Sequence, residues 1–147
     1  MLALTKKTGY GLIAMTHLAG LAEQQVASAR EIADRSGVPL SLLMNVLKQL
    51  SSAGFVESVR GVRGGYRLAR DPAEISLADL ITAVEGPIRL AECVAQGEEV
   101  DNDAPCRLLD RCPIADPVHR VQRRLSDFLK TVSLADIAKP SLAAADK

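Results

Sequence analysis

The fold is decided by residues 28–50, which read SAREIADRSGVPLSLLMNVLKQL. Ser28 and Glu31 have the spacing of a capping box, in which each side chain bonds a backbone N–H of the other residue, so a helix is expected to begin here. Gly37 should end it, because glycine readily takes the left-handed conformation found after helices. A second helix is expected over residues 39–53. Two helices joined by a tight glycine turn predict a helix-turn-helix.

The second helix of this pair has two faces of different kinds. Apolar residues recur at the i, i+3, i+4 and i+7 spacing of a buried helical stripe: Leu43, Val46, Leu47 and Leu50. The opposite side carries small polar side chains and one lysine: Ser41, Asn45, Lys48 and Ser52. Such a face fits the major groove of DNA, where Asn pairs with adenine, Ser donates or accepts, and Lys reaches guanine or phosphate. The alternative is an ordinary solvated helix face.

A glycine-rich turn between two short β-prone stretches follows directly. Residues 55–59 and 66–68 predict the strands and RGVRGG, at 60–65, predicts the turn, so together they indicate the wing of a winged helix. Arginines on such a hairpin suit a narrow minor groove or phosphates, and four residues become candidate DNA contacts: Arg60, Gly61, Arg63 and Arg67. The turn lacks the Lys-Ser/Thr ending of a nucleotide-binding loop. An ordinary hairpin is the alternative.

The segment before residue 28 predicts one amphipathic helix from Thr5 to Glu23, because apolar residues recur there at helical spacing. Thr5 and Lys6 lie at its start, where backbone N–H groups of a helix are free to bind anions. We therefore expect Thr5 and Lys6 to contact the DNA backbone.

The charge of the chain is balanced in total and divided in sequence. The 147 residues carry 18 basic and 18 acidic side chains. Residues 1–70 have nine Lys or Arg against four Asp or Glu, and residues 71–147 have nine against fourteen. A basic half is typical of proteins that bind nucleic acid. Two Tyr and two Phe are too few for stacking on single strands, which favours double-stranded DNA.

No part of the sequence predicts a membrane protein. No apolar run approaches the roughly 18 residues of a membrane span, and the first residues lack the layout of a signal peptide. We therefore expect a cytoplasmic protein without a membrane partner.

The second half of the chain predicts a long helix with one uncovered stripe. A capped helix is expected from Ser76 to just before Gly86, and an aperiodic stretch over 91–113 follows. The long helix after it has apolar residues along one narrow stripe: Ile114, Val118, Val121, Leu125, Phe128, Leu129 and Val132. Because no other predicted element is left to cover this stripe, we expect a second copy of the chain to bury it.

Four regions are expected from this reading. They are a DNA-binding domain over 1–72, a connecting helix with a cysteine-bearing loop over 73–113, a dimerisation helix with a C-terminal segment over 114–138, and a flexible tail over 139–147.

Three cysteines, Cys93, Cys106 and Cys112, fall within the aperiodic stretch. Twelve residues separate the first two and five separate the last two, which is too wide for the paired ligands of a structural zinc site. Thiolates at wide spacing on a loop can hold an iron–sulfur cluster, although three thiolates leave one ligand short. On spacing alone, inert or redox-active thiols fit equally well.

Several stretches together resemble the winged-helix iron–sulfur repressors that include IscR and NsrR. The most specific are the wing, RGVRGGYRL at 60–68, and the three cysteines before a long helix; further matching stretches are LTKKTGY at 4–10, VPLSLL at 38–43 and ISLADL at 75–80. The likeness extends to about Ala138, and within the family it is strongest to regulators of the SUF iron–sulfur assembly system. The resemblance implies a homodimer that binds a palindromic operator with an affinity that depends on a 2Fe-2S or 4Fe-4S cluster.

Matching positions imply roles for six residues: base contacts for Ser41 and Asn45, minor-groove entry for Arg60, and cluster thiolates for Cys93, Cys106 and Cys112. The first cysteine gap is longer than is typical of the family, because it holds the acidic run over 98–103. The family's fourth cluster ligand falls here on Ala115 or Gly9, neither of which can ligate. His119 is therefore the candidate fourth ligand, and an ordinary surface histidine is the alternative.

The sequence thus predicts a mainly α protein with a β-hairpin wing, built as a winged helix-turn-helix with a long C-terminal dimerisation helix. The expected function is a homodimeric repressor or activator whose operator binding is switched by an iron–sulfur cluster. The alternative is a cluster-free winged-helix transcription factor that responds by thiol oxidation or protein contacts. An enzyme is not expected, because neither histidine has a nucleophile or acid partner at motif spacing.

Overall fold

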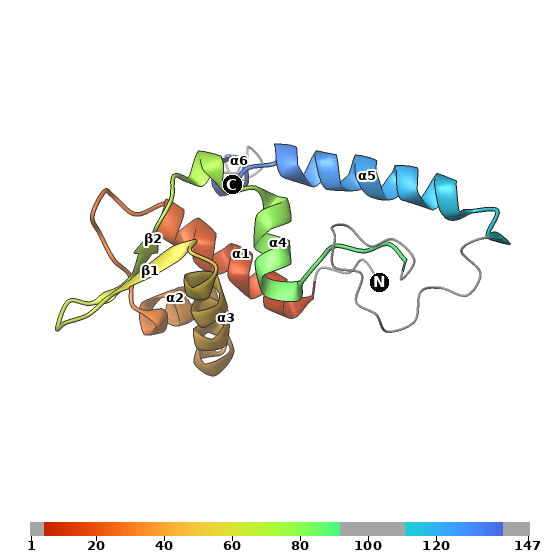
Figure 1. The fold of residues 1–147 in the computed structure, drawn as a ribbon. Coiled ribbons are helices and arrows are strands. Elements are labelled where there is room, and N and C mark those ends of the chain that lie inside the picture. The colour runs from red at the N-terminus through yellow and green to blue at the C-terminus, as the bar shows by residue number, and fades with distance from the viewer. Residues whose placement is uncertain (1–4, 92–110, 140–147) are drawn as a thin grey trace, which may run out of the picture.

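The computed structural model describes residues 5–91 and 111–139, which form a bundle of helices with one hairpin and one long helix extending from the bundle (Figure 1). In chain order the elements are α1 (Lys6–Ala19), α2 (Ala29–Ser36), α3 (Leu40–Ser52), β1 (Val56–Val59), β2 (Gly65–Leu68), the 3-10 helix η1 (Pro72–Glu74), α4 (Leu77–Glu85), α5 (Ala115–Thr131) and α6 (Leu134–Ala138). The predicted fold class is confirmed, including the antiparallel hairpin and the long C-terminal helix.

Some predicted features lie outside the described residues. They are Cys93, Cys106, the acidic run over 98–103 and all but the first residue of the tail over 139–147. Within the residues that are described, no helix is long and apolar enough to cross a membrane.

Side-chain caps place α2 where the sequence predicted it. The Ser28 hydroxyl accepts a hydrogen bond from the Glu31 N–H at 3.1 Å, and Gly37 ends the helix with a φ of 71°. The predicted capping box is only half formed, because the Glu31 carboxylate lies 3.9 Å from the Arg35 guanidinium one turn further on. A complete box occurs instead at Ser133, the residue before α6.

The first helix is shorter than predicted. α1 ends at Ala19 and not at Glu23, because Gly20 caps it and directs its N–H back to carbonyls of the last turn. Gly11 is buried where α1 crosses α3, and a Cβ placed on it would meet Val46 at 3.4 Å. Glycine weakens a helix, but here it allows two helices to approach closely.

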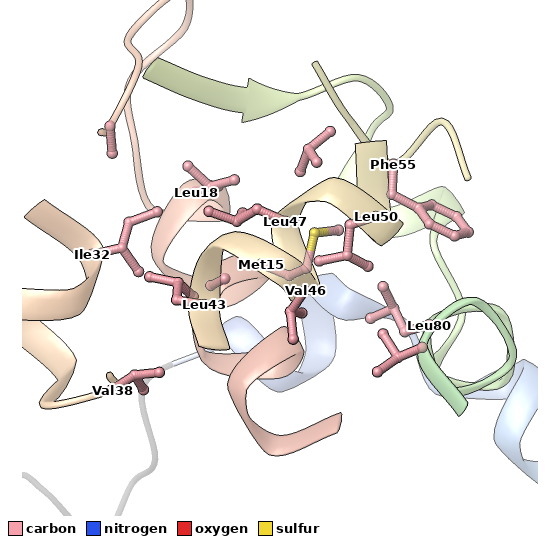
Figure 2. Close-up of a cluster of buried hydrophobic side chains, with 14 of the residues drawn as sticks. Met15, Leu18, Ile32, Val38, Leu43, Val46, Leu47, Leu50, Phe55 and Leu80 are labelled. Atoms are coloured by element: carbon pink, nitrogen blue, oxygen red, sulfur yellow. The ribbon is translucent and has the colours of Figure 1, made fainter. Parts of the chain in front are cut away.

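One hydrophobic core holds α1, α2, α3, the hairpin and α4 together (Figure 2). The predicted stripe of α3 is confirmed as buried, with exposures of 1% or less: Leu43, Val46, Leu47 and Leu50. Met15 of α1 is fully buried in the same cluster, and Leu134 of α6 joins it from the far end of the chain. With one face of α3 fixed against this core, its opposite face must point outward.

The apolar stripe of α5 is divided between two surfaces. Leu129 is buried and Leu125 half-buried against Ala78 and Ile81 of α4. The expectation that nothing in the chain would cover this stripe is therefore wrong for these two residues, because α4 packs along that side of α5. Three residues of the stripe remain exposed, by 56–62%: Ile114, Val121 and Phe128.

A buried amide on α5 holds the segment that precedes residue 92. Gln122 is fully buried, and its Nε2 donates to the Ile88 carbonyl at 2.6 Å while its Oε1 accepts from the Leu90 N–H at 2.8 Å. Nε2 also lies 3.3 Å from the Ser126 hydroxyl. Because a buried amide loses stability when its polar atoms are unpaired, these bonds fix residues 88–90 on α5.

The other end of α5 is tied to the start of α4. The Leu77 N–H donates to the Val132 carbonyl and the Leu134 N–H donates to the Ile75 carbonyl, each at 2.8 Å. The long helix is thus attached to the bundle on both sides of α4, at residues 88–90 and at residues 132–134.

Candidate nucleic-acid interface

The polar face of α3 points outward, as predicted. Ser41, Asn45 and Lys48 are all exposed, and their spacing of four and three residues places them on one side of the helix. Leu42 and Met44 beside them are exposed by 47% and 51%. This face therefore offers hydrogen-bond donors, acceptors and apolar atoms, which are the groups that read base edges and thymine methyls in a major groove.

Asn45 lies between two hollows in the surface. The first, of about 330 Å³, opens between α3 and the hairpin; we call it the α3–hairpin groove, and its polar lining is Asn45, Lys48, Ser51, Ser52, Ser58 and Tyr66. The second, of about 270 Å³, opens between α3 and the start of α1, where Lys6, Lys7 and Tyr10 line it. Lys6 is exposed there and flanks the α3 face, while its contact with the DNA backbone stays a prediction.

Two glycines at the end of the turn are required by the packing of the hairpin. The Ala27 backbone bonds that of Tyr66 in both directions, at 2.8 and 3.0 Å, which brings the chain before α2 against the hairpin. A Cβ on Gly65 would lie 2.6 Å from the Ala27 carbonyl oxygen, and one on Gly64 would lie 2.3 Å from that of Val59. Both glycines of the Gly-Gly-Tyr motif are thus explained by close backbone, Gly64 within the turn and Gly65 against the chain before α2.

The turn of the hairpin presents its arginines to solvent. The loop between β1 and β2 extends beyond the helices (Figure 1). Arg60, Gly61, Val62 and Arg63 are exposed, and neither arginine pairs with a carboxylate in the described part of the chain. Both guanidinium groups are therefore available to a minor groove or to phosphates.

Arg67 is separated from the other predicted contacts. It stands opposite Glu57 in the strand register and forms an ion pair with that carboxylate. Because side chains alternate along a strand, Arg67 and Glu57 lie on one face of the hairpin while Ser58 and Tyr66 lie on the other, toward α3. Arg67 instead lines a hollow with residues 21–25.

Thr5 has an intramolecular role at the start of α1. Its hydroxyl accepts from the N–H groups of Lys7 and Thr8 and donates to the Glu85 carboxylate at the end of α4. Thr8 donates to the same carboxylate at 2.7 Å, and the Lys7 ammonium bonds the Val84 carbonyl at 2.9 Å. Hydrogen bonds from Thr5 and then Thr8 hold the pKa of Glu85 below its ordinary value of 4.5.

The position near the α1 N-terminus that favours an anion is thus taken by a carboxylate of the same chain. The predicted phosphate contact at Thr5 competes with this bond. We call these contacts of Thr5, Lys7 and Thr8 with Val84 and Glu85 the α1–α4 clamp.

Of the predicted cluster ligands, the structure describes Cys112 and His119. Cys112 is a half-buried free cysteine just before α5, and His119 is half-buried in the second turn of α5. Residues 5–91 and 111–139 contain no group of three or more His, Cys, Asp or Glu side chains arranged to hold a metal ion. The described part of the chain therefore contributes one thiol and one imidazole, and Cys93 and Cys106 lie outside it.

Sequence reasoning missed two features of this surface and one buried residue of α5. Ser58 and Tyr66 reach α3 only through the strand register, and Glu85 reaches α1 only through the packing of α4. Gln122 left a signal, since it interrupts the apolar spacing around Leu125 with a polar residue, which indicates a buried hydrogen bond.

Comparison with known proteins places this fold among transcriptional regulators. The family Rrf2, described as an iron-dependent transcriptional regulator, matches residues 4–140. The HTH-type transcriptional regulator IscR of Vibrio campbellii is 32% identical over 136 residues, which cover 92% of this chain and 77% of that protein.

Two solved structures show the same winged-helix architecture. CymR, the global cysteine regulator of B. subtilis, superposes with a TM-score of 0.72 at 27% identity, over 96% of this chain and 99% of that one. IscR of T. potens superposes with a TM-score of 0.71 at 28% identity, over 99% of this chain and 93% of that one.

Proposed function

Because this chain belongs to the Rrf2 family of DNA-binding transcriptional regulators, which are not enzymes, we propose that it is an IscR-like switch. In this proposal a homodimer binds a palindromic operator, and an iron–sulfur cluster held by Cys93, Cys106 and Cys112 sets its affinity. The genes controlled are those of iron–sulfur cluster assembly of the SUF type, or those of iron and redox stress. The resemblance to SUF regulators and the iron-dependent description of the family support this regulon.

The proposed DNA-binding surface rests on one observation: the polar face of α3 points outward beside the exposed turn of the hairpin. Asn45 is placed to bond an adenine edge, Ser41 and Lys48 to bond neighbouring bases or phosphates, and Arg60 with Arg63 to enter the adjacent minor groove. The buried core behind α3 fixes which face of the helix points outward, and a preorganised face favours base-specific contacts.

The dimer is proposed on the exposed stripe of α5. Ile114, Val121 and Phe128 are spaced by seven residues and exposed by 56–62%, and half-buried Val118 lies between the first two. A heptad of apolar residues is the pattern by which one helix packs along another, so a second copy would bury it. Two recognition helices related by a two-fold axis then fit half-sites about 34 Å apart.

The described residues are compatible with a cluster near the first half of α5. Leu90 is bound to Gln122, and Cys93 follows three residues later, within about 11 Å of chain. His119 lies about one helical turn before Gln122 and Cys112 precedes α5, so the imidazole and the thiol both lie toward the N-terminal end of α5 from the point where Leu90 is held. When bound, the cluster would supply an oxidant- and iron-sensitive link among these thiolates. His119 is the proposed fourth ligand.

Anaerobic purification tests the cluster directly. We expect a coloured protein with visible absorption and with labile iron and sulfide, and each Cys→Ala change at 93, 106 or 112 should remove them. The His119→Ala variant should retain the colour but lose it faster in air.

A colourless protein without labile sulfide, whose DNA binding responds to peroxide through Cys112, would contradict the cluster. That result would support regulation by thiol oxidation, which the free thiol of Cys112 and the likeness to a cysteine regulator make the second candidate.

A further inference from the structure

Six of the seven residues that line the α3–hairpin groove are polar, and the seven come from α3 and from both strands of the hairpin. Ser58 and Tyr66 are direct partners in the strand register, so their side chains leave the same face of the hairpin. Lys48 and Ser51 of α3 line the same hollow. Two strands and one helix thus direct hydrogen-bonding groups at one volume of about 330 Å³.

Several of these groups are free to bind a ligand, including three from the two sides of the groove. The hydroxyls of Ser58 and Tyr66 and the ammonium of Lys48 have no hydrogen-bond or ion-pair partner among the described residues. Ser52 differs, because its hydroxyl donates to the Lys48 carbonyl at 3.0 Å. No carboxylate lines the groove, since Glu57 lies on the other face of the hairpin. Two neutral donors and one cation without an acidic neighbour favour an anion.

The groove also lies where a DNA strand has to pass. If α3 enters a major groove and the turn of the hairpin reaches the adjacent minor groove, the sugar–phosphate strand that separates the two runs between them. The hollow, of about 330 Å³, has room for a phosphate group.

We infer that the α3–hairpin groove seats one phosphate of this strand, bound by the Lys48 ammonium and by hydrogen bonds donated by the Ser58 and Tyr66 hydroxyls. The inference rests on the proposed binding of DNA through α3. The hairpin then has a second role, because a phosphate bound on its α3-facing side fixes the position of the recognition helix along the major groove of the DNA.

The first test compares the removal of hydroxyl groups with the removal of the Lys48 charge. Ser58→Ala and Tyr66→Phe should each weaken binding to a duplex that the wild-type chain has selected from a random-sequence library, by about three- to tenfold. The dependence on salt should stay unchanged, since no charge is lost, whereas Lys48→Gln should lower the slope of log K against log salt by about 1. Thr82→Val, which removes an exposed hydroxyl of α4 bonded within its own helix, is the matched control.

The second test identifies the phosphate. A single neutral methylphosphonate is moved along one strand of the same duplex, and binding is measured by fluorescence anisotropy for the wild-type chain and for Tyr66→Phe. At one position in each half-site, the methylphosphonate should weaken DNA binding by the wild-type chain. At the same position it should cause little further loss of affinity in Tyr66→Phe. If the two losses multiply at every position, or if Ser58→Ala and Tyr66→Phe bind like the wild-type chain, the groove does not hold a phosphate.

Folding and the wider proposal are checked separately. Neither hydroxyl has a partner within the described chain, so the urea midpoints of both variants should equal that of the wild-type chain, and a lowered midpoint would contradict the assignment of free hydroxyls. If the wild-type chain selects no DNA at all, the proposed function fails together with this inference. If it selects DNA and the phosphate scan is flat, only the inference fails.

Discussion

At the scale of one residue, the missing Cβ of Gly65 shows why the wing motif has a glycine at this position. Its absent Cβ leaves room for the Ala27 carbonyl, which approaches because Ala27 and Tyr66 exchange two backbone hydrogen bonds. The sequence indicated a glycine-rich turn, but this partner lies 38 residues earlier in the chain and no local pattern could reveal it.

A pair of alanine substitutions tests this reading. Gly65→Ala should lower the free energy of unfolding by about 1–3 kcal/mol, because backbone must move to admit the methyl group. Gly9→Ala is the matched control, since a Cβ there meets nothing within 4 Å and alanine should stabilise the helix by about 0.5–1 kcal/mol. Urea unfolding of both variants gives the sign of each change in the free energy of unfolding. A stabilised Gly65→Ala variant would rule out the close contact.

Other single residues show what a sequence pattern leaves open. The polar face of α3 was predicted correctly because helical spacing fixes which side chains share a face. Thr5 and Arg67 were predicted as DNA contacts, but their roles depend on Glu85 and Glu57. The carboxylate of Glu57 comes from the facing strand and that of Glu85 from a distant helix, so neither pairing follows from local spacing.

At the scale of elements, the α1–α4 clamp joins the start of the first helix to the end of the fourth. Glu85 lies at the C-terminus of its own helix, where a negative charge is unfavourable, but also at the N-terminus of α1, where it is favoured. The clamp connects the hollow beside Asn45 to α4, and residues 88–90 after α4 are bound to α5.

The clamp predicts how stability depends on pH. The pKa of Glu85 is lower in the folded chain than its ordinary value of 4.5, so its contribution to stability is present above about pH 4.5 and is lost as the pH falls through the lowered pKa. Glu85→Gln should therefore be less stable than the wild-type chain at neutral pH, and the difference should shrink on acidification. A carbon NMR titration should show the Glu85 pKa rising in Thr8→Val; an unchanged pKa would argue against the bond.

Helix boundaries illustrate which elements a sequence determines. Ser28 with Gly37 and Ser76 with Gly86 were recognised because caps act within one turn. The end of α1 was placed four residues too late, because apolar residues continue at helical spacing beyond Gly20. Periodicity alone did not show that Gly20 ends the helix.

At the scale of the whole molecule, the two sides of α5 differ in what covers them. One side packs on α4 through Leu125 and Leu129, and the other exposes Val121 and Phe128. Sequence periodicity identified the stripe but not its division, since the spacing cannot distinguish an apolar residue covered by the same chain from one left for a partner. The division into 1–72, 73–113, 114–138 and 139–147 stays a prediction; the main core already includes residues from beyond 72.

Two kinds of substitution on α5 should therefore behave differently. Val121→Asp with Phe128→Asp should give a folded monomer in sedimentation experiments, because the exposed stripe tolerates charge in the monomer but not in an apolar interface. Leu129→Asp should instead unfold the C-terminal part of the chain, since it buries a charge against α4. A dimer that survives both exposed substitutions would place the interface elsewhere.

The zero net charge of the chain conceals an excess of basic residues in its first half, where we propose that DNA binds. Binding of the selected operator should be measured for two charge-reversed chains, Arg60→Glu with Arg63→Glu in the hairpin, and Arg123→Glu with Arg124→Glu on α5. We predict a loss of at least about a hundredfold for the hairpin pair and less than about tenfold for the α5 pair, which shares its charge change but not its position. Equal losses, or a larger loss from α5, would contradict the assignment of DNA binding to α3 and the hairpin.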